Sequence, residues 1–284
     1  MTAEMNKHLL ISGCSTGIGR ACALHFAKNG YHVFAGVRKV SDAESLEADD
    51  HSGNLEPVML DVTNETQLSE LKATLTSRIG DVGLVGLVNN AGIARGGPLE
   101  HVDPQQVRDM FNVNVMGPVL LTKTFLPLLR VAKGRVVMIS SAAGKLPLAL
   151  MGAYNISKFG LEAFNDTLRQ ELAPHGIHVS LVAPGPIKTP LLQSSGDGFQ
   201  EVLESLSKEG KEQYGDLIEK MRVYFQTAAR NALPPQAVAD AVEHALESER
   251  PKTRYRVTKE AKLAYFFRWA LSDRALDFVI SKSM

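Results

Sequence analysis

Six short apolar segments alternate with helical patterns along the first two thirds of the chain, and this alternation limits the fold more than any other feature. Apolar character continues through each segment, as expected for strands covered by helices on both faces. The segments are residues 8–12, 31–37, 56–60, 85–88, 135–139 and 178–182. Strands that alternate with helices predict an α/β fold with a doubly wound parallel sheet. Residues 254–257 add a seventh, edge-like strand, and the 284 residues fit a single domain.

Composition excludes several classes of function. Lys plus Arg and Asp plus Glu each number 31, so the formal net charge is +0 and a broad nucleic-acid surface is not expected. No run of eighteen apolar residues occurs, so we expect no membrane-spanning segment. The polar start, residues 1–8, carries no apolar signal-peptide region. We therefore expect a cytoplasmic protein.

The cysteines and histidines indicate neither a disulfide nor a metal site. Cys14 and Cys22 would lie ~12 Å apart if one helix carried both, whereas a disulfide needs Cα atoms within ~7 Å. We expect free thiols in a reducing compartment. His175 and His178 lie close in sequence but have no carboxylate or cysteine partners nearby. No metal is predicted.

A glycine-rich turn follows the first strand. Gly13, Gly17 and Gly19 stand between that strand and a helix that stops at residues 29–30, Asn-Gly. Glycines allow a tight turn, and a helix N-terminus offers N–H groups to a phosphate. The spacing is G-x-x-x-G-x-G rather than G-x-G-x-x-G. The turn could be a plain loop, but its position between strand and helix favours phosphate binding.

Basic residues follow the second strand. Dinucleotide folds place an acid here for the ribose 2′-hydroxyl of NAD, or an arginine for the 2′-phosphate of NADP. This chain has Val37, Arg38 and Lys39 and no acid. The pair could be a solvated basic loop, but we predict NADP(H), with Arg38 making most of the interaction.

Tyr154 and Lys158 lie four residues apart in a helix predicted over 152–172, so their side chains share one face. A phenol titrates near ~10, and a neighbouring ammonium favours the phenolate and lowers that pKa. Such a tyrosine can exchange a proton at working pH. The alternative is a solvated or packed Tyr–Lys pair without a catalytic role. The motifs around the pair decide between these two interpretations.

Further polar residues fall at the carboxyl ends of strands, where open α/β sheets bind ligands. They occupy residues 61–62, 89–92, 140–144 and 183–189. A long helix predicted over 103–131 carries Asn112 and Asn114. A buried asparagine without a partner costs ~1–3 kcal/mol, which suggests a role, although asparagine can also pair with backbone.

These motifs together resemble the classical short-chain dehydrogenase/reductase family over about residues 7–189. The matching residues are Gly13, Gly17, Gly19, Asp61-Val62, Asn89-Asn90-Ala91-Gly92, Asn114, Ser141, Tyr154, Lys158 and Pro184-Gly185. Ser141 lies thirteen residues before Tyr154, as in the family pattern, and Asn114 matches better than Asn112. The chain is most similar to the 17β-hydroxysteroid and retinol dehydrogenase-like branch, including bacterial oxidoreductases of that type, on residues 13–19, 185–190 and 251–259.

The resemblance implies a role for each matched residue. Tyr154 is the acid in reduction and the base in oxidation, and Lys158 lowers its pKa and holds the nicotinamide ribose. Ser141 and Tyr154 bind the substrate oxygen, and Asn114 belongs to a proton relay through water. Arg38 and Lys39 join the expected cofactor contacts, which are Gly13, Ser15, Thr16, Gly17, Ile18, Gly19, Asp61, Val62, Asn90, Ala91, Gly92, Tyr154, Lys158, Pro184, Gly185, Ile187 and Thr189.

Two regions outside the matched motifs are expected to shape the substrate site. Residues 190–235 read as an irregular insertion with short helices at 201–206 and 214–225, which we interpret as a lid, with a structural flap or a subunit contact as alternatives. The aromatic and basic extension at about 258–284 predicts a helix over the cleft or against a partner subunit; a peripheral membrane contact is the alternative. The resemblance also implies a homo-oligomer formed through the two long helices.

The sequence therefore predicts an NADP(H)-dependent oxidoreductase that interconverts an alcohol and a carbonyl on a bulky apolar substrate of steroid, retinoid or long-chain type. One alternative is a cofactor-sensing protein without turnover, although a sensor does not need Ser141, Tyr154 and Lys158 together. A sugar-nucleotide epimerase or dehydratase is the other, and the glycine spacing and residues 89–92 argue against it.

Overall fold

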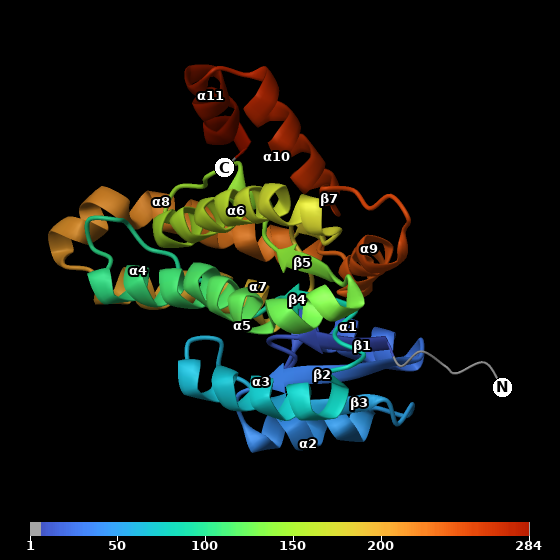
Figure 1. Cartoon of the computed structure of the whole chain (residues 1–284). Coiled ribbons are helices and arrows are strands. Elements are labelled where there is room, and N and C mark those ends of the chain that lie inside the picture. Colours follow the sequence, from blue (N-terminus) through green and yellow to red (C-terminus); the bar gives the residue numbers. More distant parts are fainter. Residues whose placement is uncertain (1–6, 284) are drawn as a thin grey trace.

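The computed structural model describes residues 7–283. The prediction that residues 1–8 carry no signal peptide therefore falls mostly outside the described residues. Over the described range, seven parallel strands form one sheet in the order β3-β2-β1-β4-β5-β6-β7 (Figure 1). The strands are β1 (Lys7–Ile11), β2 (Tyr31–Val37), β3 (Leu55–Met59), β4 (Gly86–Asn89), β5 (Arg135–Ile139), β6 (His178–Ala183) and β7 (Arg254–Arg256). Each predicted strand is confirmed to within one residue at each end.

Helices cover both faces of the sheet, which confirms the doubly wound fold. On one face lie α1 (Gly17–Lys28), α2 (Val40–Asp49) and α9 (Gln236–Glu247). On the other lie α3 (Glu65–Ile79), α5 (Gly117–Ala132) and α6 (Gly152–Leu172). Between α4 (Pro104–Phe111) and α5 the chain continues through a π-helical turn, Asn112–Met116.

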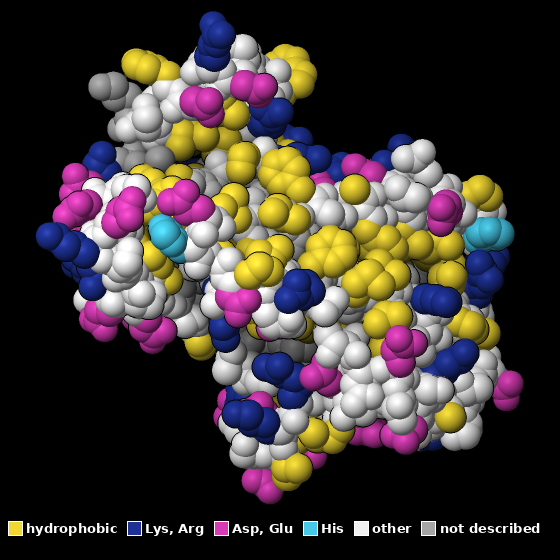
Figure 2. Space-filling model, turned by 90° about the vertical axis from the view of Figure 1, so that its left-hand side faces the viewer, with side chains coloured by type: hydrophobic (Ala, Val, Ile, Leu, Met, Phe, Trp, Pro, Cys, Tyr) yellow, Lys and Arg dark blue, Asp and Glu magenta, His cyan; other side chains and the backbone are white. Residues whose placement is uncertain are grey.

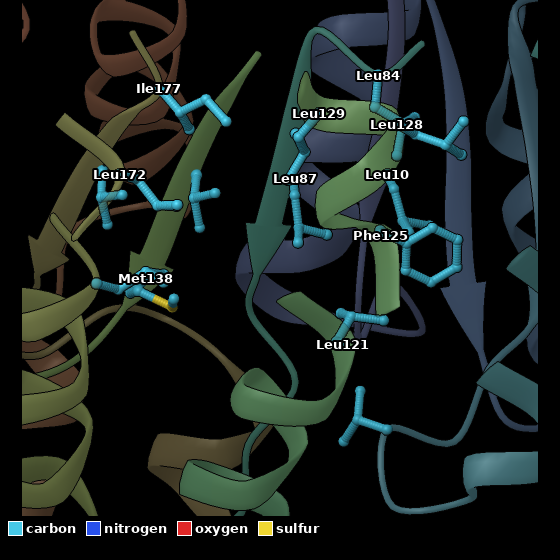
Figure 3. Packing of buried hydrophobic residues seen from close by; sticks show 14 of the residues in the cluster. Leu10, Leu84, Leu87, Leu121, Phe125, Leu128, Leu129, Met138, Leu172 and Ile177 are labelled. Carbon is cyan, nitrogen blue, oxygen red and sulfur yellow. The ribbon is translucent and has the colours of Figure 1, made fainter. Parts of the chain in front are cut away.

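The apolar runs in the strands form the core. Leu10 and Leu87 on neighbouring strands β1 and β4 pack with Phe125 and Leu129 of α5 and with the rest of one large cluster (Figure 3). The strand order changes direction between β1 and β4, because β2 and β3 lie to one side and β5 to β7 to the other. Ligands bind at such a switch point in open α/β sheets.

Two predictions about the helices need correction, and the helical C-terminal extension is as predicted. Helix α2 was not expected, because Leu46 is its one buried residue and its pattern is mostly polar. The insertion at 190–235 is not irregular: it forms two long helices, α7 (Pro190–Ser205) and α8 (Lys208–Arg230). The C-terminal extension forms α10 (Lys259–Ala270) and α11 (Asp273–Ser283), which project from the body beyond α6 (Figure 1).

The continuous helix Pro104–Ala132 is, by length and composition alone, the one helix among the described residues that could cross a membrane. Core helices pass the same test. Leu121, Phe125, Leu128 and Leu129 of this helix are buried in the main hydrophobic cluster. Its apolar character is therefore explained by packing against the sheet.

Candidate active site

The turn between β1 and α1 has a backbone that requires glycine. Gly13 and Gly17 have φ values of +72° and +60°, in the left-handed region. A Cβ on Gly19 would lie 2.1 Å from the carbonyl oxygen of Gly13. The three glycines therefore allow the loop to fold tightly and to approach a ligand closely.

The N-terminus of α1 keeps its N–H groups available to an anion. The N-cap residue is Thr16, and within the described residues its side chain makes no capping hydrogen bond and the first turn holds no acid. A helix start usually has such partners, because its first N–H groups lack intrahelical acceptors. The turn and the helix dipole together fit a pyrophosphate group.

Asn90 holds the glycine turn in place. Its amide nitrogen donates to the carbonyl oxygens of Ser12 at 3.0 Å and Gly13 at 2.9 Å. In return, Ser12 Oγ accepts from the backbone N–H groups of Asn90 and Ala91. These bonds join the carboxyl ends of β1 and β4 on either side of the switch point.

A cavity of about 410 Å³ opens along the carboxyl ends of the strands. It is lined by most of the residues that the sequence analysis assigned to the site: Gly13, Ser15, Thr16, Gly17, Ile18, Arg38, Asp61, Val62, Asn90, Ala91, Gly92, Ser141, Tyr154, Lys158, Pro184, Gly185, Ile187 and Thr189. Among the described residues, Gly19, Lys39 and Asn114 are not part of this lining. Gly19 packs inside the turn, and exposed Lys39 is the N-cap residue of α2.

Ser141, Tyr154 and Lys158 all line the cavity. Ser141 follows β5, and its Oγ accepts the backbone N–H of Ala143 at 3.2 Å. The Ser141 side chain lies near enough to the hydroxyl of Tyr154 to act on its pKa. Lys158 Nζ lies 5.7 Å from the ring centroid of Tyr154 and donates to the carbonyl oxygen of Ile139 at 3.0 Å.

Burial controls the pKa values of this group. It raises the pKa of Tyr154 above its ordinary value, and the neighbouring Ser141 side chain opposes that rise. Burial also lowers the pKa of Lys158 to about 8. Desolvation is therefore the largest influence on the phenol, while Lys158 Nζ bonds to Ile139, and a lowering of the Tyr154 pKa by Lys158 stays a prediction.

Asn114 lies behind the cavity, in the π-helical turn, and is 1% exposed. Its amide accepts from the N–H and donates to the carbonyl of Ile93, both at 2.9 Å, and it donates to Ser157 Oγ at 2.9 Å. Its polar side chain is thus fully used by local structure. A Cβ built on Gly92 would lie 3.3 Å from Asn114 Oδ1 and 3.8 Å from Lys158 Nζ, so both side chains border Gly92.

The apolar part of the cavity comes from residues that motif reasoning did not assign. Its apolar lining includes Leu146, Leu148, Met151, Leu191, Leu192, Tyr224, Phe225, Ala228 and Ala264. Tyr224 and Phe225 belong to the stretch 214–225, which was predicted as a short helix of the lid. Residues 260 and 264 show that α10 lies against the cavity, as the preferred interpretation of the extension expected.

Comparison with known proteins identifies the family. A profile described as short chain dehydrogenase matches residues 7–199, more than half of the chain. The chain belongs to the short-chain dehydrogenase family. Relatives of this short-chain dehydrogenase are named dehydrogenases and reductases, so it is an oxidoreductase of CH-OH groups that uses a nicotinamide cofactor.

Two relatives and one solved structure illustrate this placement. Retinol dehydrogenase 5 of Mus musculus is 36% identical over 96% of this chain and 87% of its own length. The NADPH-dependent 3-dehydrocapnine reductase of Ornithobacterium rhinotracheale is 32% identical over 98% of this chain and 97% of its own length. The crystal structure of a short-chain dehydrogenase from Streptomyces avermitilis has a TM-score of 0.77 at 27% identity. The match covers 99% of this chain and 96% of that one. The short-chain dehydrogenase therefore lies near the retinol dehydrogenase-like branch.

Proposed function

We propose that the protein is an NADP(H)-dependent oxidoreductase that interconverts an alcohol and a carbonyl on a bulky apolar substrate. One observation carries this proposal: Ser141, Tyr154 and Lys158 line a single cavity together with the glycine turn and a group of apolar side chains. A carbonyl placed there contacts two hydroxyl groups, and its apolar remainder lies among Leu148, Met151 and Phe225.

In reduction, the bound nicotinamide cofactor supplies the hydride. Ser141 donates a hydrogen bond to the carbonyl oxygen and orients it, and this bond strengthens as negative charge develops on that oxygen. Tyr154 then delivers its proton to the same oxygen. Its raised pKa keeps the phenol protonated at neutral pH, which suits the acid role in reduction.

Lys158 and Asn114 support the proton transfer. We assign Lys158 to contact with the nicotinamide ribose and to electrostatic support of the phenolate that remains after transfer. With a pKa of about 8, Lys158 can itself gain and lose a proton near working pH. Asn114 borders the same glycine as Lys158, but its amide is engaged by Ile93 and Ser157, so its assignment to a proton relay rests on the family resemblance.

Arg38 supports the choice of NADP(H). It lines the cavity at the end of β2, and it lies near enough to Asp61 to act on that carboxylate. A guanidinium in this position suits the 2′-phosphate of NADP. The relative from Ornithobacterium rhinotracheale, named as NADPH-dependent, is in line with this assignment.

The nature of the substrate is inferred from the lining. The segment 141–151, here called the Ser141 loop, and helices α7, α8 and α10 supply the apolar side chains around the substrate end. This lining favours steroid, retinoid or long-chain carbonyl compounds. The similarity to retinol dehydrogenase 5 supports an apolar alcohol or carbonyl in general terms.

We also propose a cytoplasmic homo-oligomer. Figure 2 shows a band of hydrophobic side chains across one face of the molecule. Phe111 and Met116 before α5, and Ile156 and Phe159 of α6, are 37–50% exposed, which supports self-association through these helices. Light scattering of wild type and Phe159→Glu tests this, because a loss of mass in the variant is expected.

Contact of the outer face of α10 with a membrane stays a prediction. Leu263, Phe266 and Trp269 are 51%, 53% and 83% exposed on that face. Co-flotation with anionic phosphatidylserine vesicles, lost in Trp269→Ser, would support the contact; no flotation of the wild type would exclude it under those conditions.

The proposed function is tested by replacing Tyr154 with Phe. Loss of the hydroxyl should lower turnover of an apolar aldehyde by roughly 10²–10⁴-fold while NADPH binding, measured by fluorescence, is kept. Tyr31→Phe serves as a matched control, because Tyr31 also loses a hydroxyl but does not line the cavity. Full activity in Tyr154→Phe would contradict the proposed chemistry, and NADPH binding without any turnover in the wild type would favour the sensor alternative.

A further inference from the structure

A buried carboxylate lies one helical turn beyond the catalytic lysine. Glu162 is on α6, four residues after Lys158, and is 2% exposed. A charged group removed from water costs several kcal/mol unless it is well paired. The mechanism proposed above does not use Glu162, so its burial needs a separate explanation.

Partners from three other segments surround Glu162. Arg254 of β7 donates from Nε at 3.0 Å and from Nη2 at 2.7 Å to Oε2. Lys145, in the loop after Ser141, places Nζ 3.3 Å from the same oxygen. Tyr265 of α10 donates its hydroxyl to Oε1.

Arg254 and Tyr265 have further contacts that fix them. Arg254 Nη2 also lies 2.6 Å from Asp166, one turn further along α6. The guanidinium of Arg256 lies 4.8 Å from the ring centroid of Tyr265. Arginine and tyrosine therefore meet Glu162 in defined positions rather than as mobile surface groups.

The segments joined by Glu162 are also walls of the substrate cavity. Ser141 and Leu146, on either side of Lys145, line it, and so does Ala264, the neighbour of Tyr265. Helix α10 packs against the short turn Ala142–Gly144 and against β7. Its outer face is exposed, whereas Ala261, Ala264 and Tyr265 form its buried side.

We propose that Glu162 is a positioning residue for substrate binding, which holds the Ser141 loop and the C-terminal helix α10 against the catalytic helix. The inference rests on the proposed function, because it assigns these segments to the substrate end of the cavity. Glu162 does not touch the reacting atoms. It fixes the distance between the catalytic serine and the apolar wall that the substrate contacts.

The test removes one hydroxyl with Tyr265→Phe. This change keeps Arg254 and Lys145 on Glu162, whereas replacing Glu162 would leave those cations without their buried partner. We expect KM for an apolar aldehyde to rise roughly five-fold, with kcat and the Kd for NADPH within about two-fold of wild type. The melting temperature should fall by about 2–4 °C.

Tyr31→Phe is the matched control. Tyr31 is 3% exposed and donates its hydroxyl to Glu247 at 2.9 Å, so the variant loses the same kind of bond at a site outside the cavity lining. Its melting temperature should fall while KM stays at the wild-type value. Equal KM values in the two variants would overturn the proposal, because a role limited to stability predicts that result.

Amide hydrogen exchange of the NADPH-bound protein gives a second measurement that does not need turnover. Faster exchange in residues 142–148 and 259–270 of Tyr265→Phe, but not of Tyr31→Phe, supports the proposal. Unchanged exchange in both segments overturns it. If the wild type turns over no carbonyl, the proposed function fails, and the exchange result still decides whether Glu162 couples these segments.

Discussion

The cofactor end of the cavity is built from strand ends and tight turns, whereas the substrate end is built from helices. At the cofactor end, Gly13, Gly17 and Asn90 are fixed by backbone geometry and by hydrogen bonds to β1 and β4. At the substrate end, α7 and α8 form a small apolar cluster around Phe199 and Met221, apart from the two clusters of the sheet.

This difference affects how each end tolerates change. The turn at the cofactor end must bring N–H groups to a fixed phosphate geometry, so its backbone is restricted. The helices at the substrate end present an apolar surface, and their cluster is separate from the two clusters of the sheet. We therefore expect cofactor binding and substrate binding to respond separately to mutation.

The largest effect that separates the two ends should come from a pair of buried phenylalanines. Phe125 of the sheet core is 0% exposed, and Phe199 of α7 is 1% exposed. Phe125→Ala should lower the global free energy of unfolding by about 3–5 kcal/mol. Phe199→Ala should instead loosen α7 and α8, raise KM and expose this region to proteolysis, with the Kd for NADPH unchanged.

The measurements are denaturant unfolding, limited proteolysis and NADPH titration of both variants. If Phe199→Ala weakened NADPH binding as much as it weakened substrate binding, the two ends would not be independent. The small cluster would then belong energetically to the sheet core.

A pH-dependent effect should come from Lys158, which lies at the junction of the two ends. Burial lowers its pKa from 10.5 to about 8, so the folded state disfavours the charged form. This destabilisation by the buried charge is complete below pH 8. It disappears as the pH rises toward 10.5, the pKa of Lys158 in the unfolded chain. The stability of the wild type relative to Lys158→Met should therefore rise by about 3 kcal/mol between pH 8 and 10.5.

Urea unfolding of both proteins at several pH values measures this difference. A difference that stays flat from pH 7 to 10.5 would show that Lys158 is well solvated or paired in the folded protein. Lys158 would then affect stability only through its hydrogen bond to Ile139, without a cost from burial of its charge.

The smallest effect should be confined to the cofactor end. Arg38→Ala removes the cation that lines the cavity beyond β2, and Lys39→Ala removes its exposed neighbour outside the lining. We expect kcat/KM for NADPH to fall about ten-fold in Arg38→Ala at low salt, with less change at high salt. Lys39→Ala should stay within about two-fold, and NADH kinetics should not change in either.

An equal fall of kcat/KM for NADPH in Arg38→Ala and Lys39→Ala would show that the 2′-phosphate responds to the overall positive charge rather than to Arg38. An equal loss with NADH and NADPH in Arg38→Ala would contradict the preference for NADP(H).

The two ends also differ in how well the sequence predicts them. Strand ends and glycine turns are local features, so β1, the glycine turn and the Tyr154 helix were located from short segments. Of α7 and α8 only the stretches 201–206 and 214–225 were predicted as helical, since the region contains glycines at 196, 198, 210 and 215, a residue type that weakens helices. In the structure these glycines lie inside the helices, where Gly196 packs near Phe225 and Gly210 near His101.

Long-range pairing was beyond the reach of sequence reasoning. Glu162 meets Arg254 and Tyr265 from 92 and 103 residues away, and no local pattern indicates that a buried carboxylate of α6 has these partners. The burial of the Tyr154 phenol, which raises its pKa, could not be read from the local pattern for the same reason. Helical spacing places Lys158 nearby, but the desolvation of the phenol depends on segments that arrive from elsewhere in the chain.

The most direct test of the central claim is NADPH oxidation by the wild-type protein with a panel of carbonyl compounds, with NADH in parallel. The panel contains all-trans-retinal, a 17-ketosteroid, a medium-chain aldehyde and a small ketone. Turnover of the bulky apolar members, faster with NADPH than with NADH, is the predicted result. Preference for the small ketone, or faster turnover with NADH, would contradict the assignments of the apolar end and of Arg38.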